Sequence, residues 1–317
     1  MAQSGAKVAV VGATGIVGGQ IAELIGERDF PWAELRLFAA DSSTQSVESG
    51  DRMLPVSRLD EPSDLAPFDI AILAIDGAKA SEIIAARPGP ILIDLSTATI
   101  AGGTPIVAPG LTARERVVEI SNAKLIGVPH PAAQVIAAIL TALDGSGGFA
   151  GAGVMLSASA GGHQAVSKLF EQSVDLLNAR LDLADDEPQL AFNVLAAPGS
   201  HELAAVIAAQ VSALGANASS LAVNVVSVQT FHGSAVALFL PASTNSGEWA
   251  QRLRAAPGII LVEGDDASGM VDAVGQEAVI VRMSLSQAGA AIWCVFDGAR
   301  LAALTAVWIA ETLASHD

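Results

Sequence analysis

Cysteine is almost absent from this chain of 317 residues, in which Cys294 is the single example. One cysteine excludes an intrachain disulfide and any metal cluster held by several thiolates. The five histidines show none of the spacing with carboxylates that is typical of metal ligands. We therefore expect no bound metal ion.

Basic residues are also scarce, because 16 lysines and arginines face 33 aspartates and glutamates, for a formal net charge of -17. Nucleic acids and anionic membranes bind basic patches, so neither is an expected partner. No run approaches the ~18 uncharged apolar residues of a membrane span. The residues from Met1 to Lys7 lack the layout of a signal peptide, and we expect a cytoplasmic protein.

The chain does contain a glycine-rich loop near its start. Residues 8–19 read V-A-V-V-G-A-T-G-I-V-G-G, an apolar strand that leads into Gly12, Gly15 and Gly18. The first glycine allows a tight turn, the second a close approach to a pyrophosphate, and the third helix packing against the sheet. A helical stretch at 18–26 follows, whose N-terminus would face the phosphates. The order predicts a dinucleotide site; the alternative is a glycine-rich turn without a ligand.

The first part of the chain alternates between strands and helices, which predicts an α/β fold with a doubly wound parallel sheet of the Rossmann type. The expected strands are Val8 to Val11, Leu35 to Ala39, Ile70 to Ala74 and Ile91 to Leu95. Asp41 follows the second strand, where a carboxylate commonly accepts from the ribose 2′-hydroxyl. It therefore favours NAD over NADP, unless it is only a solvated turn residue.

The pattern of apolar residues changes from residue 151 onward, where the strand-like runs are longer. These runs predict an α+β second domain with a mixed or antiparallel sheet. Its expected strands are 153–160, 221–228 and 235–240, and its expected helices 164–179 and 201–214. The last run, 299–315, has helical spacing and is expected to pack on the first domain. We thus expect a dinucleotide-binding domain at 1–128 with 299–317, and a catalytic-like domain at 129–298.

Several motifs together resemble one enzyme family. They are the glycine loop, E-R-D-F-P-W-A-E-L-R-L-F-A at 27–39, I-D-L-S at 93–96, H-Q-A-V-S-K-L-F-E-Q-S-V-D-L-L-N at 163–178, A-F-N-V-L at 191–195 and W-I-A-E at 308–311. The chain resembles aspartate-semialdehyde dehydrogenase nearly end to end. The resemblance implies reductive dephosphorylation of an acyl phosphate, in which a cysteine thiolate attacks, a histidine handles protons, arginines hold anions and a nicotinamide delivers hydride. It also implies a homodimer formed through the second domain.

The implied nucleophile does not match this chain. Where the family has an N-P-N-C-S-T-like segment, residues 128–133 read V-P-H-P-A-A, which sets Pro131 on the cysteine. Proline suits the first turn of a helix but carries no nucleophile. His130 as a replacement nucleophile does not lead to a hydride donor, and Cys294, in an apolar strand, fits a buried structural cysteine. The chain resembles the branch of the family that lacks the catalytic cysteine.

The implied anion-binding positions differ as well. The phosphate-binding arginine falls on Ile100 and the carboxylate-binding arginine on Val225, while a lysine and a glutamate of the family fall on Ala205 and Ala209. A doubly anionic substrate is normally gripped by charge-assisted, bidentate pairs. Their loss should remove substrate binding as well as turnover.

Other implied site residues are retained. V-S-V-Q-T-F-H-G-S-A-V at 226–236 places His232 on the catalytic histidine, a residue type suited to proton transfer near neutral pH; its alternative is a packed, structural histidine. The implied cofactor contacts are Gly12, Thr14, Gly15, Ile16, Val17 and Gly161. The family's arginine for a 2′-phosphate falls on Ser42, and an asparagine falls on Gly298. NAD is the favoured cofactor, retained or vestigial.

Three functions remain open from the sequence. The first is an NAD(P)-binding protein, or pseudoenzyme, without the phosphorylating dehydrogenase activity and with a possible protein partner. The second is an active oxidoreductase, either a dehydrogenase with a rearranged site or an enzyme that uses His232 in hydride transfer to another carbonyl. The third is a structural role, as a dimer or as the inactive subunit of a mixed dimer.

Overall fold

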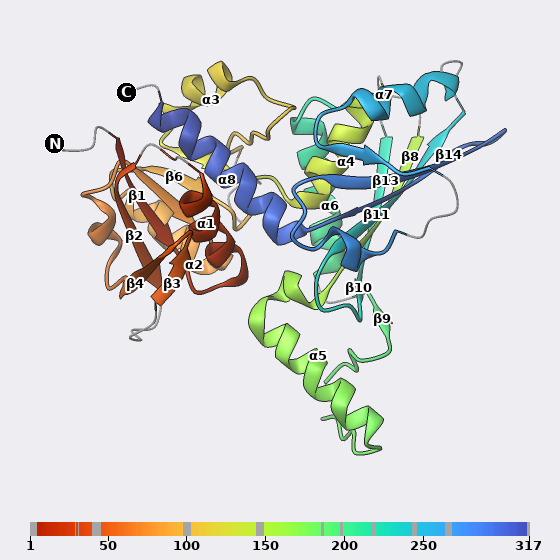
Figure 1. Ribbon diagram of the computed structural model, residues 1–317, viewed down its shortest axis with the longest axis horizontal. Coiled ribbons are helices and arrows are strands. Elements are labelled where there is room, and N and C mark those ends of the chain that lie inside the picture. Colours follow the sequence, from red (N-terminus) through yellow and green to blue (C-terminus); the bar gives the residue numbers. More distant parts are fainter. Residues whose placement is uncertain are drawn as a thin grey trace. The chain divides into compact units, whose positions relative to one another are not determined.

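The computed structural model describes residues 5–28, 30, 32–39, 46–97, 103–143, 149–184, 187–196, 199–216, 220–242, 246–263 and 268–315. The chain divides into two compact units (Figure 1). Unit 1 is Met1–His130 with Arg300–Asp317, and unit 2 is Pro131–Ala299.

Unit 1 is built on a seven-stranded sheet with the order β3-β4-β2-β1-β5-β6-β7. Its strands are β1 (Ala6–Val11), β2 (Trp32–Ala39), β3 (Ser46–Ser49), β4 (Arg52–Arg58), β5 (Ile70–Leu73), β6 (Ile91–Asp94) and β7 (Leu125–Gly127). All neighbours pair in parallel except β3, which runs antiparallel to β4. The predicted parallel, Rossmann-type sheet is confirmed, with one antiparallel strand added at its edge.

The helices of unit 1 complete its two-sided core. They are α1 (Ile16–Glu27), α2 (Gly77–Ala86), α3 (Arg114–Ser121) and α8 (Gly298–Ala314). The C-terminal helix belongs to this core, because Ala303 and Val307 are fully buried in one apolar cluster with Val8 and Ile21. Arg300, only 8% exposed, fastens the same helix to α1 through a 3.0 Å ion pair with Glu27.

Unit 2 contains a second seven-stranded sheet, with the order β12-β13-β14-β11-β8-β10-β9. Its strands are β8 (Phe149–Leu156), β9 (Val194–Leu195), β10 (Ser220–Val228), β11 (Ser234–Pro241), β12 (Ile259–Leu261), β13 (Val279–Ser286) and β14 (Gly289–Phe296). The pairs β8/β10 and β12/β13 are parallel and the other neighbours antiparallel. The predicted mixed sheet is confirmed.

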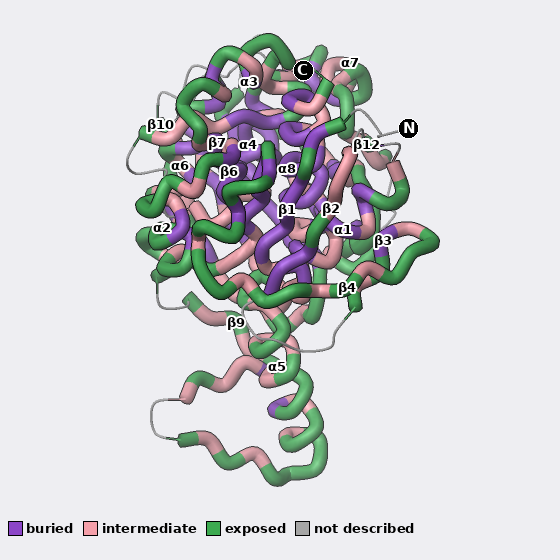
Figure 2. The backbone as a smooth tube through the Cα atoms, turned by 90° about the vertical axis from the view of Figure 1, so that its left-hand side faces the viewer, coloured by how far each residue is buried: buried purple, intermediate pink, exposed green. Residues whose placement is uncertain are grey.

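The helices of unit 2 are α4 (Pro131–Ala142), α5 (Gly162–Leu177), α6 (Ser200–Ala213) and α7 (Trp249–Ala255). The expected strand at 153–160 is partly wrong, because β8 ends at Leu156 and Ala158–Gly161 form a short 3-10 turn, η3. Gly162, with φ +80°, turns the chain from η3 into α5. In Figure 2, α5 is drawn mostly as exposed tube.

Candidate functional site

The glycine loop lies at the carboxyl end of β1, where the neighbouring strands leave little room. The amides of Gly12 and Ala13 both donate to the carbonyl oxygen of Phe38 on β2, at 2.8 and 3.0 Å. Gly12 has φ +89°, and a Cβ there would lie 2.2 Å from the carbonyl oxygen of Ala74, which follows β5. Only glycine therefore fits this turn.

Helix α1 begins directly after the loop. Gly15 is its N-cap and Gly15 N–H donates to the Gly12 carbonyl at 2.9 Å, while a Cβ on Gly18 would come within 2.0 Å of the same oxygen. Close approach of helix and loop thus depends on Gly18. The predicted contacts Thr14, Ile16 and Val17 lie in the loop and the first turn. Amides of a first helical turn lack partners inside the helix, and they form a general anion site.

The sheet order places this loop at a topological switch point. The chain passes from β1 to β2 on one side and then returns across β1 to β5 on the other. In open α/β sheets, ligands bind outside the carboxyl ends of strands at such a point. The observed arrangement is therefore the one expected of a dinucleotide site.

A cavity of about 180 Å³ lies at the same edge of the sheet. Val11, Ala39 and Ile75 form part of its apolar wall, and its charged lining residues are Asp60, Glu61, Glu82 and Lys79. Sequence reasoning missed these four. Asp60 and Glu61 reach this edge because they follow β4, a mostly exposed strand with a proline in its middle, and Lys79 and Glu82 lie on α2.

Three sequence-predicted positions lie outside the described residues: Asp41, Ser42 and Ile100. The role of Asp41 as the ribose ligand stays a prediction.

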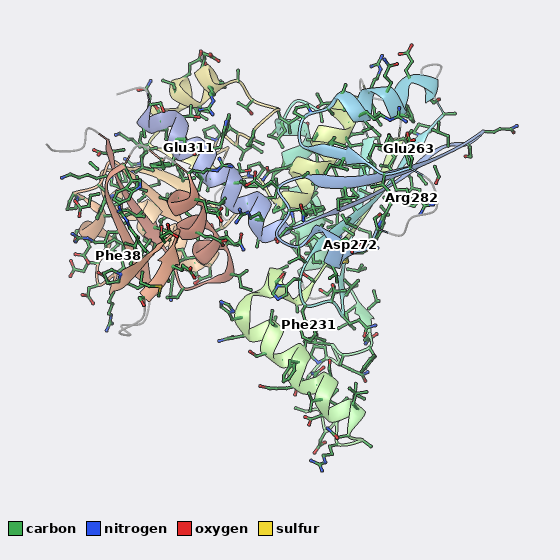
Figure 3. All side chains as sticks on the ribbon, viewed as in Figure 1. Phe38, Phe231, Glu263, Asp272, Arg282 and Glu311 are labelled. Carbon is green, nitrogen blue, oxygen red and sulfur yellow. The ribbon has the colours of Figure 1, made fainter. Side chains whose placement is uncertain are left out.

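The other two predicted site residues, His232 and Gly161, lie in unit 2. The two segments that contain them are joined by backbone hydrogen bonds. His232 is exposed in the turn between β10 and β11. This turn is held to η3, since the amides of Ala158 and Ser159 donate to the carbonyls of Thr230 and Phe231, both at 2.9 Å. Figure 3 shows the labelled Phe231 beside the start of α5.

The turn that carries His232 has a fixed backbone. Gly233 has φ +85°, and a Cβ there would lie 2.3 Å from the Met270 carbonyl oxygen. Gly161 lines a cavity of about 210 Å³ at the junction of β8 and α5, together with Ser157 and Asn193. His232 does not line this cavity. His232 is thus an exposed side chain in a turn whose backbone requires glycine at position 233, and its role in proton transfer stays a prediction.

The position implied for the nucleophile opens a helix, as expected. Pro131 is the first residue of α4, and the two alanines that follow it are fully buried. Val225, at the position implied for a carboxylate-binding arginine, is only 3% exposed on β10. Ala205 and Ala209 are exposed on α6.

The single thiol of the chain is inert. Cys294 is fully buried on β14, where it pairs with Val236 of β11 on one side and Val281 of β13 on the other. Burial raises the pKa of Cys294 from its ordinary 9.0 to about 12. A thiol that stays protonated is neither a nucleophile nor a metal ligand.

Burial also acts on His130, the last residue of unit 1. The residue keeps some surface, but desolvation of its imidazole lowers the pKa from 6.5 to about 4. A neutral imidazole of this kind is a weak base and does not replace a catalytic thiolate.

Acid should therefore destabilise the protein through His130. Between pH 6.5 and 4 the imidazole of His130 is protonated in the unfolded state but stays neutral in the folded state. The free energy of unfolding therefore decreases as the pH is lowered through this range. The expected loss is up to about 1.4 kcal/mol per pH unit. Urea denaturation from pH 7 to 4 measures it, and His130→Gln should show a shallower decline. Parallel declines in the two proteins would contradict the assignment.

Neither a metal centre nor a membrane span is found in the described part of the chain. No group of three or more His, Cys, Asp or Glu side chains could hold a metal ion there. No described helix is long and apolar enough to cross a membrane.

Known proteins resemble both the sequence and the structure. Residues 7–119 match the family model "Semialdehyde dehydrogenase, NAD binding domain". A USG-1 protein homolog from Pseudomonas aeruginosa is 34% identical over 334 residues, covering 98% of each chain. An aspartate-semialdehyde dehydrogenase from Synechocystis is 30% identical, covering 97% of each chain. The chain belongs to the aspartate-semialdehyde dehydrogenase family.

Solved structures of the aspartate-semialdehyde dehydrogenase family share this fold. Aspartate semialdehyde dehydrogenase II from Vibrio cholerae matches with a TM-score of 0.87 and 26% identity, covering 97% of this chain and 98% of that chain. A probable aspartate-semialdehyde dehydrogenase from Pseudomonas aeruginosa matches with a TM-score of 0.85 and 31% identity over the same shares. The matched family model supports a nicotinamide cofactor in the domain that carries the glycine loop.

Proposed function

We propose that this protein binds a nicotinamide dinucleotide but does not catalyse the phosphorylating dehydrogenase reaction of its family. The observation that carries the proposal is Cys294, the single cysteine in the sequence, which is fully buried and has a pKa of about 12. The reaction needs a thiolate that can reach a substrate. This chain has no thiol that meets either condition.

The surroundings of the implied substrate site support the same proposal. The resemblance sets Pro131 on the nucleophile, and Pro131 opens α4 as the cysteine would. The buried Val225 gives an apolar group where the resemblance implies a guanidinium. A substrate carboxylate would then be desolvated without a charged partner, at a cost of several kcal/mol.

We infer that NAD is preferred over NADP. The cavity beside the glycine loop carries three carboxylates, from Asp60, Glu61 and Glu82, against the one ammonium group of Lys79. Carboxylates accept hydrogen bonds from ribose hydroxyls and repel a 2′-phosphate. The predicted role of Asp41 points in the same direction.

Calorimetry and an activity assay on the purified protein test these proposals. We expect micromolar NAD binding and at least tenfold weaker NADP binding, a difference of about 1.4 kcal/mol or more. With aspartate semialdehyde, phosphate and either cofactor, turnover should not exceed a control without enzyme. A thiol reagent at pH 8 should label the protein only after denaturation.

Two outcomes would change the interpretation. Turnover above the control would refute the proposed loss of activity. No binding of either cofactor at millimolar concentration would make the glycine loop a vestige of the fold.

Hydride transfer to a less charged carbonyl is a second candidate function. It is favoured by the exposed His232, which a rigid turn presents to solvent. Direct hydride transfer needs no thiolate. If it occurs, His232→Asn should lower kcat by about 100-fold or more while NAD binding is kept, because general acid catalysis contributes about that much.

We also propose a homodimer that buries the exposed face of α5. On this helix the side chains of Phe170, Val174 and Leu177 are 59, 40 and 78% exposed. Phe192, just before β9, and Val194, the first residue of β9, are each 60% exposed. Contiguous apolar surface is typical of an interaction site. Analytical ultracentrifugation should give twice the chain mass, and Leu177→Glu should shift the equilibrium toward monomer. A monomer at micromolar concentration would leave this surface for another protein partner.

A further inference from the structure

A second cavity of unit 1 lies away from the glycine loop. It has a volume of about 520 Å³ and lies in unit 1, where β6 and β7 begin. Pockets for small organic ligands typically span about 300 to 1,000 Å³. The volume is therefore sufficient for a small molecule, whereas the cavity beside the glycine loop has about 180 Å³.

This cavity is lined mainly by apolar side chains, together with two positively charged ones. Its apolar residues include Pro88 and Pro90, from the segment that leads into β6, Leu92 on β6, and Leu125, the first residue of β7. Arg87 and Lys124 supply its charge, and none of the described residues that line it is acidic. The cavity is thus a locally positive site on a chain with a net charge of -17.

Both cations are without partners in the described part of the chain. The ion pairs and side-chain hydrogen bonds there use other arginines and lysines, while Arg87 and Lys124 are exposed and in none of them. Charges farther away than about 8 Å are largely screened at physiological salt. No described residue that lines the cavity is acidic, so no carboxylate of the lining faces the two cations.

The backbone holds both cations in an unfavourable conformation. Arg87, the C-cap of α2, has φ 49°, and Lys124, just after α3, has φ 58°. Glycine is preferred at such positions, and another residue there costs roughly 1 kcal/mol or more. A favourable interaction with the helix dipole returns about 0.3 to 1 kcal/mol. Residues in this conformation are common at ligand-binding sites, and a binding role would explain why Arg87 and Lys124 are found at positions that favour glycine.

The site is separate from the dinucleotide site. All the strands concerned run parallel, so the amino ends of β6 and β7 lie at the edge of the sheet opposite the loop after β1. At about 3.3 Å per residue, the four residues of β6 span roughly 13 Å and the six residues of β1 roughly 20 Å. A ligand in the cavity would not compete with a dinucleotide bound at the glycine loop.

We propose that this cavity binds a small organic anion, with its carboxylate or phosphate between Arg87 and Lys124 and its apolar body against Pro88, Pro90 and Leu92. Two cations match one anionic group, and proline and leucine walls match a hydrocarbon or aromatic body. The site does not depend on the function proposed above.

Titration of the 15N-labelled protein with phenyl phosphate and with benzoate tests the site. We expect saturable shifts of the Gly89 and Ala123 amides, which line the cavity, at submillimolar concentration of at least one probe. Inorganic phosphate lacks the apolar body and benzyl alcohol lacks the charge, so each should bind at least tenfold more weakly. Saturating NAD should not displace the probe.

The decisive variant is Arg87→Gly/Lys124→Gly, because glycine relieves the positive φ while it removes both charges. Binding should weaken at least tenfold with Tm unchanged or raised. Arg52→Gln/Arg180→Gln removes the same charge from two exposed residues elsewhere and should bind as the parent does. Undiminished binding by the glycine variant, no shifts at about 10 mM probe, or equal binding of inorganic phosphate would overturn the proposal.

Discussion

Gly12→Ala is expected to cost about 2 to 4 kcal/mol of stability and to lower NAD affinity more than tenfold. Two independent penalties add at this residue. Its φ of +89° is unfavourable for alanine, and the added methyl group would lie 2.2 Å from the backbone carbonyl oxygen of Ala74. Since the backbone of β5 cannot give way cheaply, the loop must move, and the first turn of α1 moves with it.

Gly19→Ala, in the helix α1 that follows this loop, is the control. A Cβ there would lie 3.8 Å from the nearest backbone oxygen, which is ordinary contact. Replacing a helical glycine by alanine should stabilise the protein by up to about 1 kcal/mol. Denaturant titration and calorimetry with NAD measure both variants. Equal stability of the two variants would show that the turn at Gly12 is more adaptable than its geometry indicates.

Alkaline pH is expected to destabilise the protein through Cys294. The folded thiol has a pKa of about 12, while the unfolded thiol titrates near its ordinary 9.0. Between these values the unfolded state releases a proton that the folded state keeps, so the free energy of unfolding falls as pH rises. The slope is up to about 1.4 kcal/mol per pH unit, or about 4 kcal/mol across the window.

Cys294→Ala isolates this contribution. The Cys294→Ala variant is less stable than the parent at every pH because the substitution leaves a small buried cavity. The quantity to compare is therefore the slope of the free energy of unfolding against pH between pH 9 and 11. The chain has no tyrosine, which removes the other side chain that commonly titrates here. Guanidinium denaturation should show a flatter decline in the variant. An equally steep decline in both proteins would mean that lysines or a pH-dependent opening dominate the alkaline limb.

The parts of the fold that could be predicted are those with a strong local signal. The strand β1, its glycine loop and α1 combine an apolar run with glycines at positions that sterically require them. The strands β8, β10 and β11 were found from similar apolar runs. The hairpin β3–β4 has no such signal, because β3 is a short, polar S-V-E-S and the apolar residues of β4 are interrupted by Pro55 and are exposed or only partly buried.

The candidate sites were harder to predict than the fold, because tertiary structure assembles them. Arg87 and Lys124 are far apart in the sequence, and only the pairing of β6 with β7 brings them to one cavity. Asp60 and Glu61 reach the dinucleotide edge only because β4 pairs with β2. In contrast, inertness of the one thiol could be predicted from the apolar run around Cys294 alone.

The buried Cys294 has a practical consequence for biophysical work. Because the native protein offers maleimide reagents no accessible thiol, any cysteine added at the surface becomes a unique attachment point without prior removal of native cysteines. Lys79→Cys, at the cavity beside the glycine loop, would carry an environment-sensitive fluorophore. Its emission would then report occupancy of the dinucleotide site in real time, from stopped-flow mixing to single molecules.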